Sequence, residues 1–242
     1  MRPWLPVLGL AVLLWAGKAG ASAEPFDYRP TDQAFRAFDR LARSAPDGSL
    51  PRLSEEGARP VLLAVWNGVA LEIGRPFEAF DTEYLRRACA AGQAVLSRYF
   101  EADEAAAAAG RPPDQRYWPE ILEGVDFVMR CAAGLLQAHA ALARRFLPGL
   151  AYAEARQGWD ELRGQLVDQF NGPLRAIAAG ALTGEAADRL TVALRESAAR
   201  IAGTLPQAER DALVTLAREA AARAAPLSRG DLEAFADIIA GR

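Results

Sequence analysis

The sequence contains few of the side chains on which metal binding most often depends. Its 242 residues include one histidine, His139, and two cysteines. Di-iron bundles take a Glu-x-x-His pair from each of two helices, and covalent haem attachment needs C-x-x-C-H, so both are excluded. Met129 and His139 lie in one predicted helix, about 15 Å apart along its axis, and cannot clamp one haem from opposite sides. We therefore expect no metal site and no cofactor.

Nucleophilic catalysis also lacks support in the sequence. There is no G-x-S-x-G motif, and any nucleophile that used a histidine base would have to use His139. Neither cysteine has neighbours that would activate a thiol. We interpret His139 as a residue on an ordinary helix face, and we favour a protein that is not an enzyme.

Lysine is almost absent: Lys18 is the only lysine in the sequence. The arginines are spread through helical segments beside Asp and Glu, and no basic cluster is longer than Arg86-Arg87 or Arg144-Arg145. This pattern is typical of solvated helix faces, so we expect no nucleic-acid partner. Loss of residues 1–23 would remove two basic residues and no acidic one, and would change the formal net charge from −3 to −5.

Hydrophobic runs long enough to span a bilayer are absent as well. The N-terminal apolar stretch from Leu5 to Ala16 is interrupted by Pro6 and is shorter than the roughly 20 residues that a spanning helix needs. With Arg2 before it and small residues up to Ala23 after it, the segment has the layout of a secretory signal peptide. We expect cleavage after Ala23, rather than an uncleaved anchor, and a periplasmic or secreted protein without a stable membrane span.

Helical periodicity dominates the rest of the chain. Apolar residues three and four positions apart predict helices over 32–43, from 82 to about 100 or beyond, over 119–146 and over 152–170. Asn171-Gly172-Pro173 is expected to end the last of these, and Gly110 to Pro119 has the composition of a loop. The fold class is therefore all-α, an irregular bundle of about seven to nine helices. We expect one domain over 24–242, with a possible sub-boundary near 171–182.

Three similar segments in the C-terminal third predict three consecutive helices. They begin at Leu182, Leu205 and Leu227, at intervals of 23 and 22 residues. Thr204 with Gln207, and Ser228 with Asp231, have the spacing of capping pairs at helix starts. The similarity fits either an internal duplication or the general resemblance of short helices.

The apolar segment from Val61 to Gly74 has two interpretations. Asn67-Gly68 between two apolar runs is a hairpin signal. A lone hairpin is marginally stable, however, and no other part of the sequence has a convincing strand pattern. We therefore predict a nearly all-buried core helix; an exposed Trp66 would instead indicate a partner site.

Acidic residues beside aromatic ones form the strongest candidate for a site. Tyr117 and Trp118 precede Glu120, Glu123 and Asp126 at the predicted start of a helix. Aromatic rings beside carboxylates suit a sugar-binding cleft, and a glutamate of raised pKa can act as the acid in glycosidic cleavage. The alternative is a solvated acidic face at a helix N-terminus.

These observations favour a non-catalytic function. We expect an exported binding, adaptor or chaperone-like factor of the cell envelope, with an envelope protein or peptide as its partner. Its candidate binding residues are Tyr117, Trp118, Glu120, Glu123 and Trp66. The alternative is a cell-wall glycosidase that uses Glu120 or Glu123.

Cys89 and Cys131 are predicted to form a disulfide between two antiparallel helices. Two cysteines allow one intramolecular pairing, and export would place them in an oxidising compartment. If the first helix ends near Phe100 and the second begins at Pro119, the two cysteines lie at similar heights along the antiparallel helix pair. Each also falls on an apolar stripe of its helix.

Two features bear on whether that bond can form. Gly92 on the first stripe would let the two backbones approach closely. If the alanines after Phe100 extend the first helix to Ala109, the heights differ by roughly 12 Å, which we expect to prevent the bond. The alternative is a pair of reduced cysteines buried as small apolar side chains.

Overall fold

The structure is a computed structural model, and it describes residues 29–45, 49–71, 79–108, 115–146 and 153–242. All regular secondary structure in these ranges is helical, which confirms the predicted all-α class. The eight α-helices described are α1 (Arg29–Ser44), α2 (Arg59–Val65), α3 (Ala79–Ala108), α4 (Trp118–Phe146), α5 (Ala153–Ala178), α6 (Gly184–Ile201), α7 (Gln207–Arg223) and α8 (Pro226–Ala240). Short 3-10 helices are η1 (Gly68–Leu71), η2 (Gln115–Tyr117) and η4 (Ala202–Thr204).

The predicted signal peptide, residues 1–23, lies outside the described residues. Within the part of the chain that the structure describes, no helix combines the length and the apolar character needed to cross a membrane.

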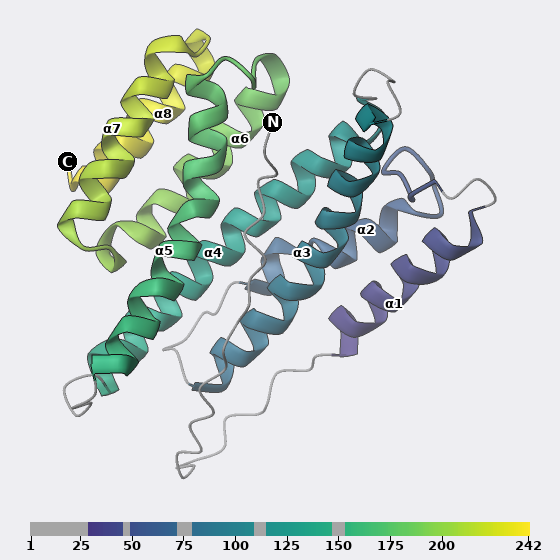
Figure 1. The fold of residues 1–242 in the computed structure, drawn as a ribbon, viewed down its shortest axis with the longest axis horizontal. Coiled ribbons are helices and arrows are strands. Elements are labelled where there is room, and N and C mark those ends of the chain that lie inside the picture. Colours follow the sequence, from purple (N-terminus) through teal and green to yellow (C-terminus); the bar gives the residue numbers. More distant parts are fainter. Residues whose placement is uncertain (1–28, 46–48, 72–78, 109–114, 147–152) are drawn as a thin grey trace.

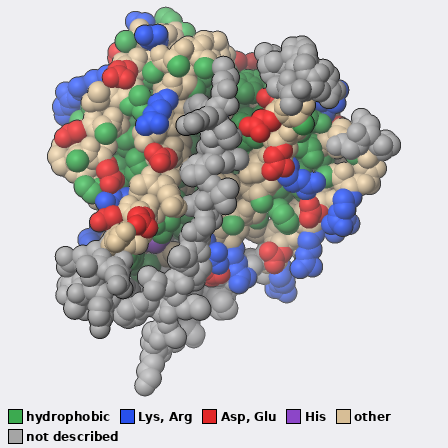
Figure 2. Space-filling model, in the orientation of Figure 1, with side chains coloured by type: hydrophobic (Ala, Val, Ile, Leu, Met, Phe, Trp, Pro, Cys, Tyr) green, Lys and Arg blue, Asp and Glu red, His purple; other side chains and the backbone are tan. Residues whose placement is uncertain are grey.

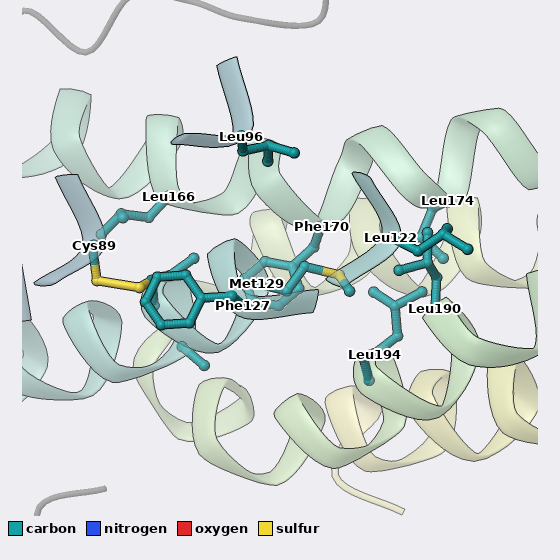
Figure 3. Packing of buried hydrophobic residues seen from close by; sticks show 14 of the residues in the cluster. Cys89, Leu96, Leu122, Phe127, Met129, Leu166, Phe170, Leu174, Leu190 and Leu194 are labelled. Carbon is teal, nitrogen blue, oxygen red and sulfur yellow. A yellow bond between two sulfur atoms is a disulfide. The ribbon is translucent and has the colours of Figure 1, made fainter. Parts of the chain in front are cut away.

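Helix α4 lies at the centre of the arrangement (Figure 1). It packs against α3 on one side and against α5 and α6 on the other, while α1 and α2 pack together beside α3. Helices α6, α7 and α8 form the C-terminal end of the bundle. Buried side chains from all of these helices make one contiguous cluster. Figure 3 shows part of it, with Phe127 and Met129 of α4 among residues of α3, α5 and α6.

The segment from Val61 to Gly74 is not one continuous helix. Helix α2 ends at Val65, because Trp66 leaves the helical conformation with φ −100° and ψ 39°. The Trp66 side chain is buried, and its indole N–H donates to the carbonyl oxygen of Gly92 at 3.2 Å. The described residues contain no strand, so the choice of helix over hairpin is confirmed up to Val65. Its continuity is wrong, and so is its near-complete burial, because Leu63 is 46% exposed. Residues 72–74 lie outside the described residues.

Helix α5 continues past the predicted stop. Pro173 lies inside the helix, which ends at Ala178 instead of at Asn171. The helical burial pattern persists through Leu174 and Ile177, whose side chains are buried. Their packing offsets the free-energy cost of the backbone hydrogen bond that Pro173 cannot donate. The helix is terminated by Gly180, whose φ of +70° is the left-handed conformation favoured at helix C-termini.

The three C-terminal helices are confirmed, but both predicted capping pairs are wrong. Helix α7 has Pro206 at its N-cap, and the Thr204 hydroxyl instead donates to the carbonyl oxygen of Ile201. Ser228 lies within the first turn of α8, where its hydroxyl donates to the Asp188 carboxylate of α6. A tertiary contact between α6 and α8 thus replaces the local cap that the sequence spacing indicated.

The predicted disulfide joins α3 to α4. The Cα atoms of Cys89 and Cys131 are 5.6 Å apart. Helix α3 extends to Ala108, so the expectation that such an extension would prevent the bond is wrong. Measured from the two cysteines, the facing ends of α3 and α4 are offset by about 9 Å along the helix axes. An offset of this size between the helix ends therefore does not prevent the two cysteines from meeting.

Glycine at position 92 permits the close approach of α3 and α4 that the sequence predicted. A Cβ atom at Gly92 would lie 2.3 Å from Cε1 of Phe127. On the opposite helix, a Cβ at Gly124 would lie 2.7 Å from Cδ1 of Leu96. Each glycine therefore makes room for a large side chain of the facing helix, one turn or more from the disulfide.

Candidate functional site

Two of the predicted site residues bind the protein's own chain. The Leu50 backbone N–H donates to the Tyr117 hydroxyl at 2.9 Å, and the Leu53 N–H donates to Oε1 of Glu120 at 2.5 Å. Tyr117 is buried, and Glu120 is 1% exposed. These contacts fasten the segment before α2 onto the start of α4, so the two side chains act first as structural anchors.

Tyr99 of α3 lies at the centre of the same aromatic cluster. Its hydroxyl donates to the carbonyl oxygen of Pro51 at 2.6 Å. Its ring centroid lies 5.9 Å from that of Trp66, 6.1 Å from that of Phe38 and 5.4 Å from that of Tyr117. Burial, followed by the nearby charge of Glu120, raises the pKa of Tyr99 above its ordinary value, so the hydroxyl remains a donor. Trp66 is therefore part of the core and is not available as a partner surface.

The other acidic residues of α4 face arginines. Glu123 accepts from Arg189 of α6, and Asp126 accepts from Nε of Arg130 at 3.0 Å. Arg130 in turn donates to Glu196 of α6 at 2.8 Å. Burial raises the pKa of Asp126, although the positive charge of Arg130 opposes this shift. Glu120 and Glu123 therefore have different partners, and Trp118 is 37% exposed at the helix start.

The different roles of the two glutamates give a direct prediction. Glu120→Ala should lower the free energy of unfolding by about 1–3 kcal/mol, because it leaves the Leu53 N–H without its partner. Glu123→Ala removes a partly exposed ion pair and should cost no more than about 1 kcal/mol. Urea denaturation of both variants measures the difference. Equal losses would contradict the anchor role of Glu120.

A cavity that the sequence did not reveal lies between α4 and α5. Its volume is about 480 Å³, within the range of roughly 300–1,000 Å³ that is typical of small-molecule sites. The lining is mostly apolar, with charged groups from both helices and one residue of η4. The lining residues are Leu136, His139, Ala140, Ala143, Arg144, Trp159, Asp160, Arg163, Leu166 and Thr204.

His139 and Trp159 form one wall of this cavity. Their ring centroids are 4.4 Å apart and the planes are at 85°, an edge-to-face contact. Burial lowers the pKa of His139 to about 4, so the imidazole is neutral at pH 7. Nδ1 is buried and has no hydrogen-bond partner among the described residues. A neutral imidazole nitrogen is either a donor or an acceptor, and leaving it unpaired costs free energy.

The charged lining residues differ in how they are compensated. Arg163 donates through Nη1 to Asp160 at 2.6 Å and through Nε to Glu209 of α7 at 2.9 Å. Arg144 lies in the last turn of α4, is exposed, and forms no salt bridge with a residue that the structure describes. One guanidinium at the cavity is therefore held by two carboxylates, while the other faces solvent.

Sequence reasoning missed this site because it depends on small residues. His139, Ala140 and Ala143 of α4 all border the cavity, and α5 contributes Trp159, whose ring contacts His139. His139 and Ala143 have the i, i+4 spacing of one helix face, but alanine is common throughout the chain and does not mark a site by itself. The pairing of α4 with α5 was needed to show that these alanines border a cavity.

The described residues contain no cluster of three or more histidine, cysteine or acidic side chains that could hold a metal ion. Acidic and basic side chains are interspersed over the face seen in Figure 2. Comparison with known proteins adds no family: no family model matches the sequence, and neither a curated protein nor a solved structure is significantly similar to it.

Proposed function

We propose that the protein is an exported, non-catalytic binding protein of the cell envelope and that the cavity between α4 and α5 is its ligand site. The observation that carries this proposal is a largely apolar cavity of ligand size, bordered by the edge-to-face pair of His139 and Trp159. Export is the expectation drawn from the N-terminal sequence.

The lining supports a small, largely apolar ligand. Leu136, Leu166 and the Trp159 ring supply apolar surface that is covered when a ligand enters. His139 contributes a polar atom without a charge, because its imidazole is neutral at pH 7. Binding in such a site is driven mainly by the apolar surface that the ligand and the lining remove from water.

The glycosidase alternative has weaker support. One oxygen of Glu120 is engaged by the Leu53 N–H, and Glu123 is paired with Arg189. A general acid must reach the glycosidic oxygen of a bound substrate, and these contacts direct both carboxylates toward the protein itself.

Filling the cavity should abolish binding of an apolar probe. We expect the uncharged dye N-phenyl-1-naphthylamine to bind the wild-type protein, and Ala140→Phe to weaken that binding by about tenfold or more because the new ring occupies the cavity. Fluorescence titration measures the affinity. The matched control is Ala222→Phe, which adds the same ring at an exposed position of α7.

Circular dichroism and thermal unfolding establish that both variants are folded. If Ala140→Phe is destabilised, the smaller Ala143→Val change tests the same cavity. No dye binding by the wild-type protein, or equal binding by the cavity and control variants, would overturn the proposed site.

A further inference from the structure

We propose that the exposed face of helix α1 binds the surface of an anionic phospholipid membrane through Arg36, Arg40 and Arg43, which we call the α1 arginine row. The contact is peripheral and electrostatic, and it is separate from the cavity between α4 and α5. The proposal concerns the surface on which the folded protein is held, so it does not depend on the ligand of the cavity.

Helix α1 has one apolar face and one basic face. Its buried side chains belong to Ala34, Phe38 and Ala42. Arg36 and Arg40 are exposed, and the Arg43 side chain is 77% exposed. At about 100° per residue, the three arginines lie within about 60° of one another around the helix and extend over about 10 Å of its axis. They therefore form one straight row on the side of α1 opposite its buried face.

The acidic residues of α1 compensate this row only in part. Asp39 accepts from Nη1 of Arg98 of α3 at 2.6 Å, whereas Nη2 of Arg43 lies 3.8 Å from the same carboxylate. Neither Arg36 nor Arg40 forms a salt bridge with a residue that the structure describes. The exposed charged residues of α1 are four arginines and one acid, namely Arg29, Arg36, Arg40, Arg43 and Asp32.

The position of α1 leaves the row open to a large partner. The helix lies at one edge of the bundle (Figure 1), and it packs against α2 and α3. Figure 2, in the same orientation, shows several basic side chains along that edge. A flat charged surface can meet all three guanidinium groups at once, whereas a small anion reaches only one or two of them.

The chemistry of the row favours anionic lipid headgroups. Each basic residue held near an anionic membrane strengthens partitioning by about fivefold. The apolar face of α1 is packed in the core, so the helix cannot insert into the acyl region as an interfacial amphipathic helix does. Phospholipid is favoured over nucleic acid as the polyanion because the N-terminal sequence predicts export to the envelope.

The net charge of the protein makes this contact easy to distinguish from a general charge effect. The chain has a formal net charge of −3, so an anionic membrane repels the molecule as a whole. Attraction therefore requires a local concentration of positive charge, such as the α1 arginine row.

The test compares vesicles that differ in headgroup charge. The protein purified after export is mixed with vesicles of phosphatidylcholine alone, or of phosphatidylcholine with an equal part of phosphatidylglycerol, and the bound fraction is measured by sedimentation. We expect the partition coefficient to be about tenfold or more higher on the anionic vesicles. In about 1 M sodium chloride, where the Debye length is about 3 Å, this preference should disappear.

Two triple variants locate the contact. The variant that removes the α1 arginine row is Arg36→Gln/Arg40→Gln/Arg43→Gln. The matched control, which removes three exposed arginines from α5 and α7, is Arg175→Gln/Arg218→Gln/Arg223→Gln. We expect the first variant to lose the preference for anionic vesicles and the control to keep it. Thermal unfolding establishes that both variants are folded.

The outcomes separate this proposal from that of the cavity. Equal partitioning of the wild-type protein onto the two kinds of vesicle overturns the membrane contact, and so does an equal loss in both triple variants. Tighter binding of the wild-type protein to duplex DNA than to the anionic vesicles overturns the assignment to lipid. Binding of N-phenyl-1-naphthylamine in the cavity should be unchanged in both variants, so its failure would bear on the proposed function alone.

Discussion

Removal of the Cys89–Cys131 disulfide is expected to lower the free energy of unfolding by about 4 kcal/mol. The two cysteines are separated by 42 residues, and the bond closes a loop of that size in the unfolded chain. In the chain-entropy model, closing such a loop lowers the entropy of the unfolded chain and thereby raises its free energy by about 4 kcal/mol at 25 °C. Because single domains are typically stable by about 5–15 kcal/mol, this is a large part of the total.

The measurement compares three states of the protein. Urea denaturation is followed for the oxidised wild-type protein, for the same protein in reductant, and for the Cys89→Ala/Cys131→Ala variant. The reduced protein keeps both buried sulfur atoms, so its difference from the double variant reports packing alone. Thiol titration under denaturing, non-reducing conditions verifies the bond. Two reactive thiols per chain, or equal stability in oxidised and reduced protein, would contradict this prediction.

The disulfide also connects stability to the expected location of the protein. Disulfides persist in oxidising compartments and are rare where thiols are kept reduced. A chain held in the cytosol would lose the loop constraint between α3 and α4. The predicted export is therefore a condition for the full stability of this bundle.

Gly92→Ala is the second change with a large expected effect. A methyl group there would lie 2.3 Å from Cε1 of Phe127, well inside van der Waals contact. Forcing extra volume into a packed core typically costs about 1–3 kcal/mol. The disulfide at Cys89, one turn away, holds α3 and α4 together, so the helices cannot separate to relieve the clash. We expect a net loss of about 2–3 kcal/mol, even though alanine favours a helix over glycine by about 1 kcal/mol.

Two controls isolate this effect. Gly230→Ala in α8 places the same methyl group in open space and should stabilise the protein by about 0.5–1 kcal/mol. Phe127→Leu removes the ring that collides, so the Gly92→Ala/Phe127→Leu double variant should lose less than the sum of the single changes. Strict additivity, or a stabilising Gly92→Ala, would show that Phe127 moves aside without cost.

The sequence by itself determined the helical class and most of the helix positions. The periodicity placed helices at Arg29–Ser44, Ala79–Ala108 and Trp118–Phe146 to within a few residues, apart from the extension of α3. Cys89, Gly92 and Cys131 were also identified as facing residues of two helices, because apolar spacing shows which side of a helix turns inward.

The tertiary structure decided what local signals could not. Asn171-Gly172-Pro173 reads as a helix stop, yet α5 continues because Leu174 and Ile177 are buried against the rest of the core. Ser228 has the spacing of a cap, yet its hydroxyl binds Asp188, a residue 40 positions away. In both cases long-range packing outweighed a local preference of a few kcal/mol at most.

For the candidate site residues as well, the sequence identified the side chains and the tertiary structure determined their partners. Glu120 and Glu123 are three positions apart and look equivalent in the sequence, but one anchors the segment before α2 and the other pairs with α6. The cavity beside His139 is bordered by the small side chains of Ala140 and Ala143 of α4 and by Trp159 of α5. Helical periodicity reports which residues turn inward, because it depends on the geometry of one helix. The partner that each inward residue meets depends on how the helices pair, and only the tertiary structure determines that.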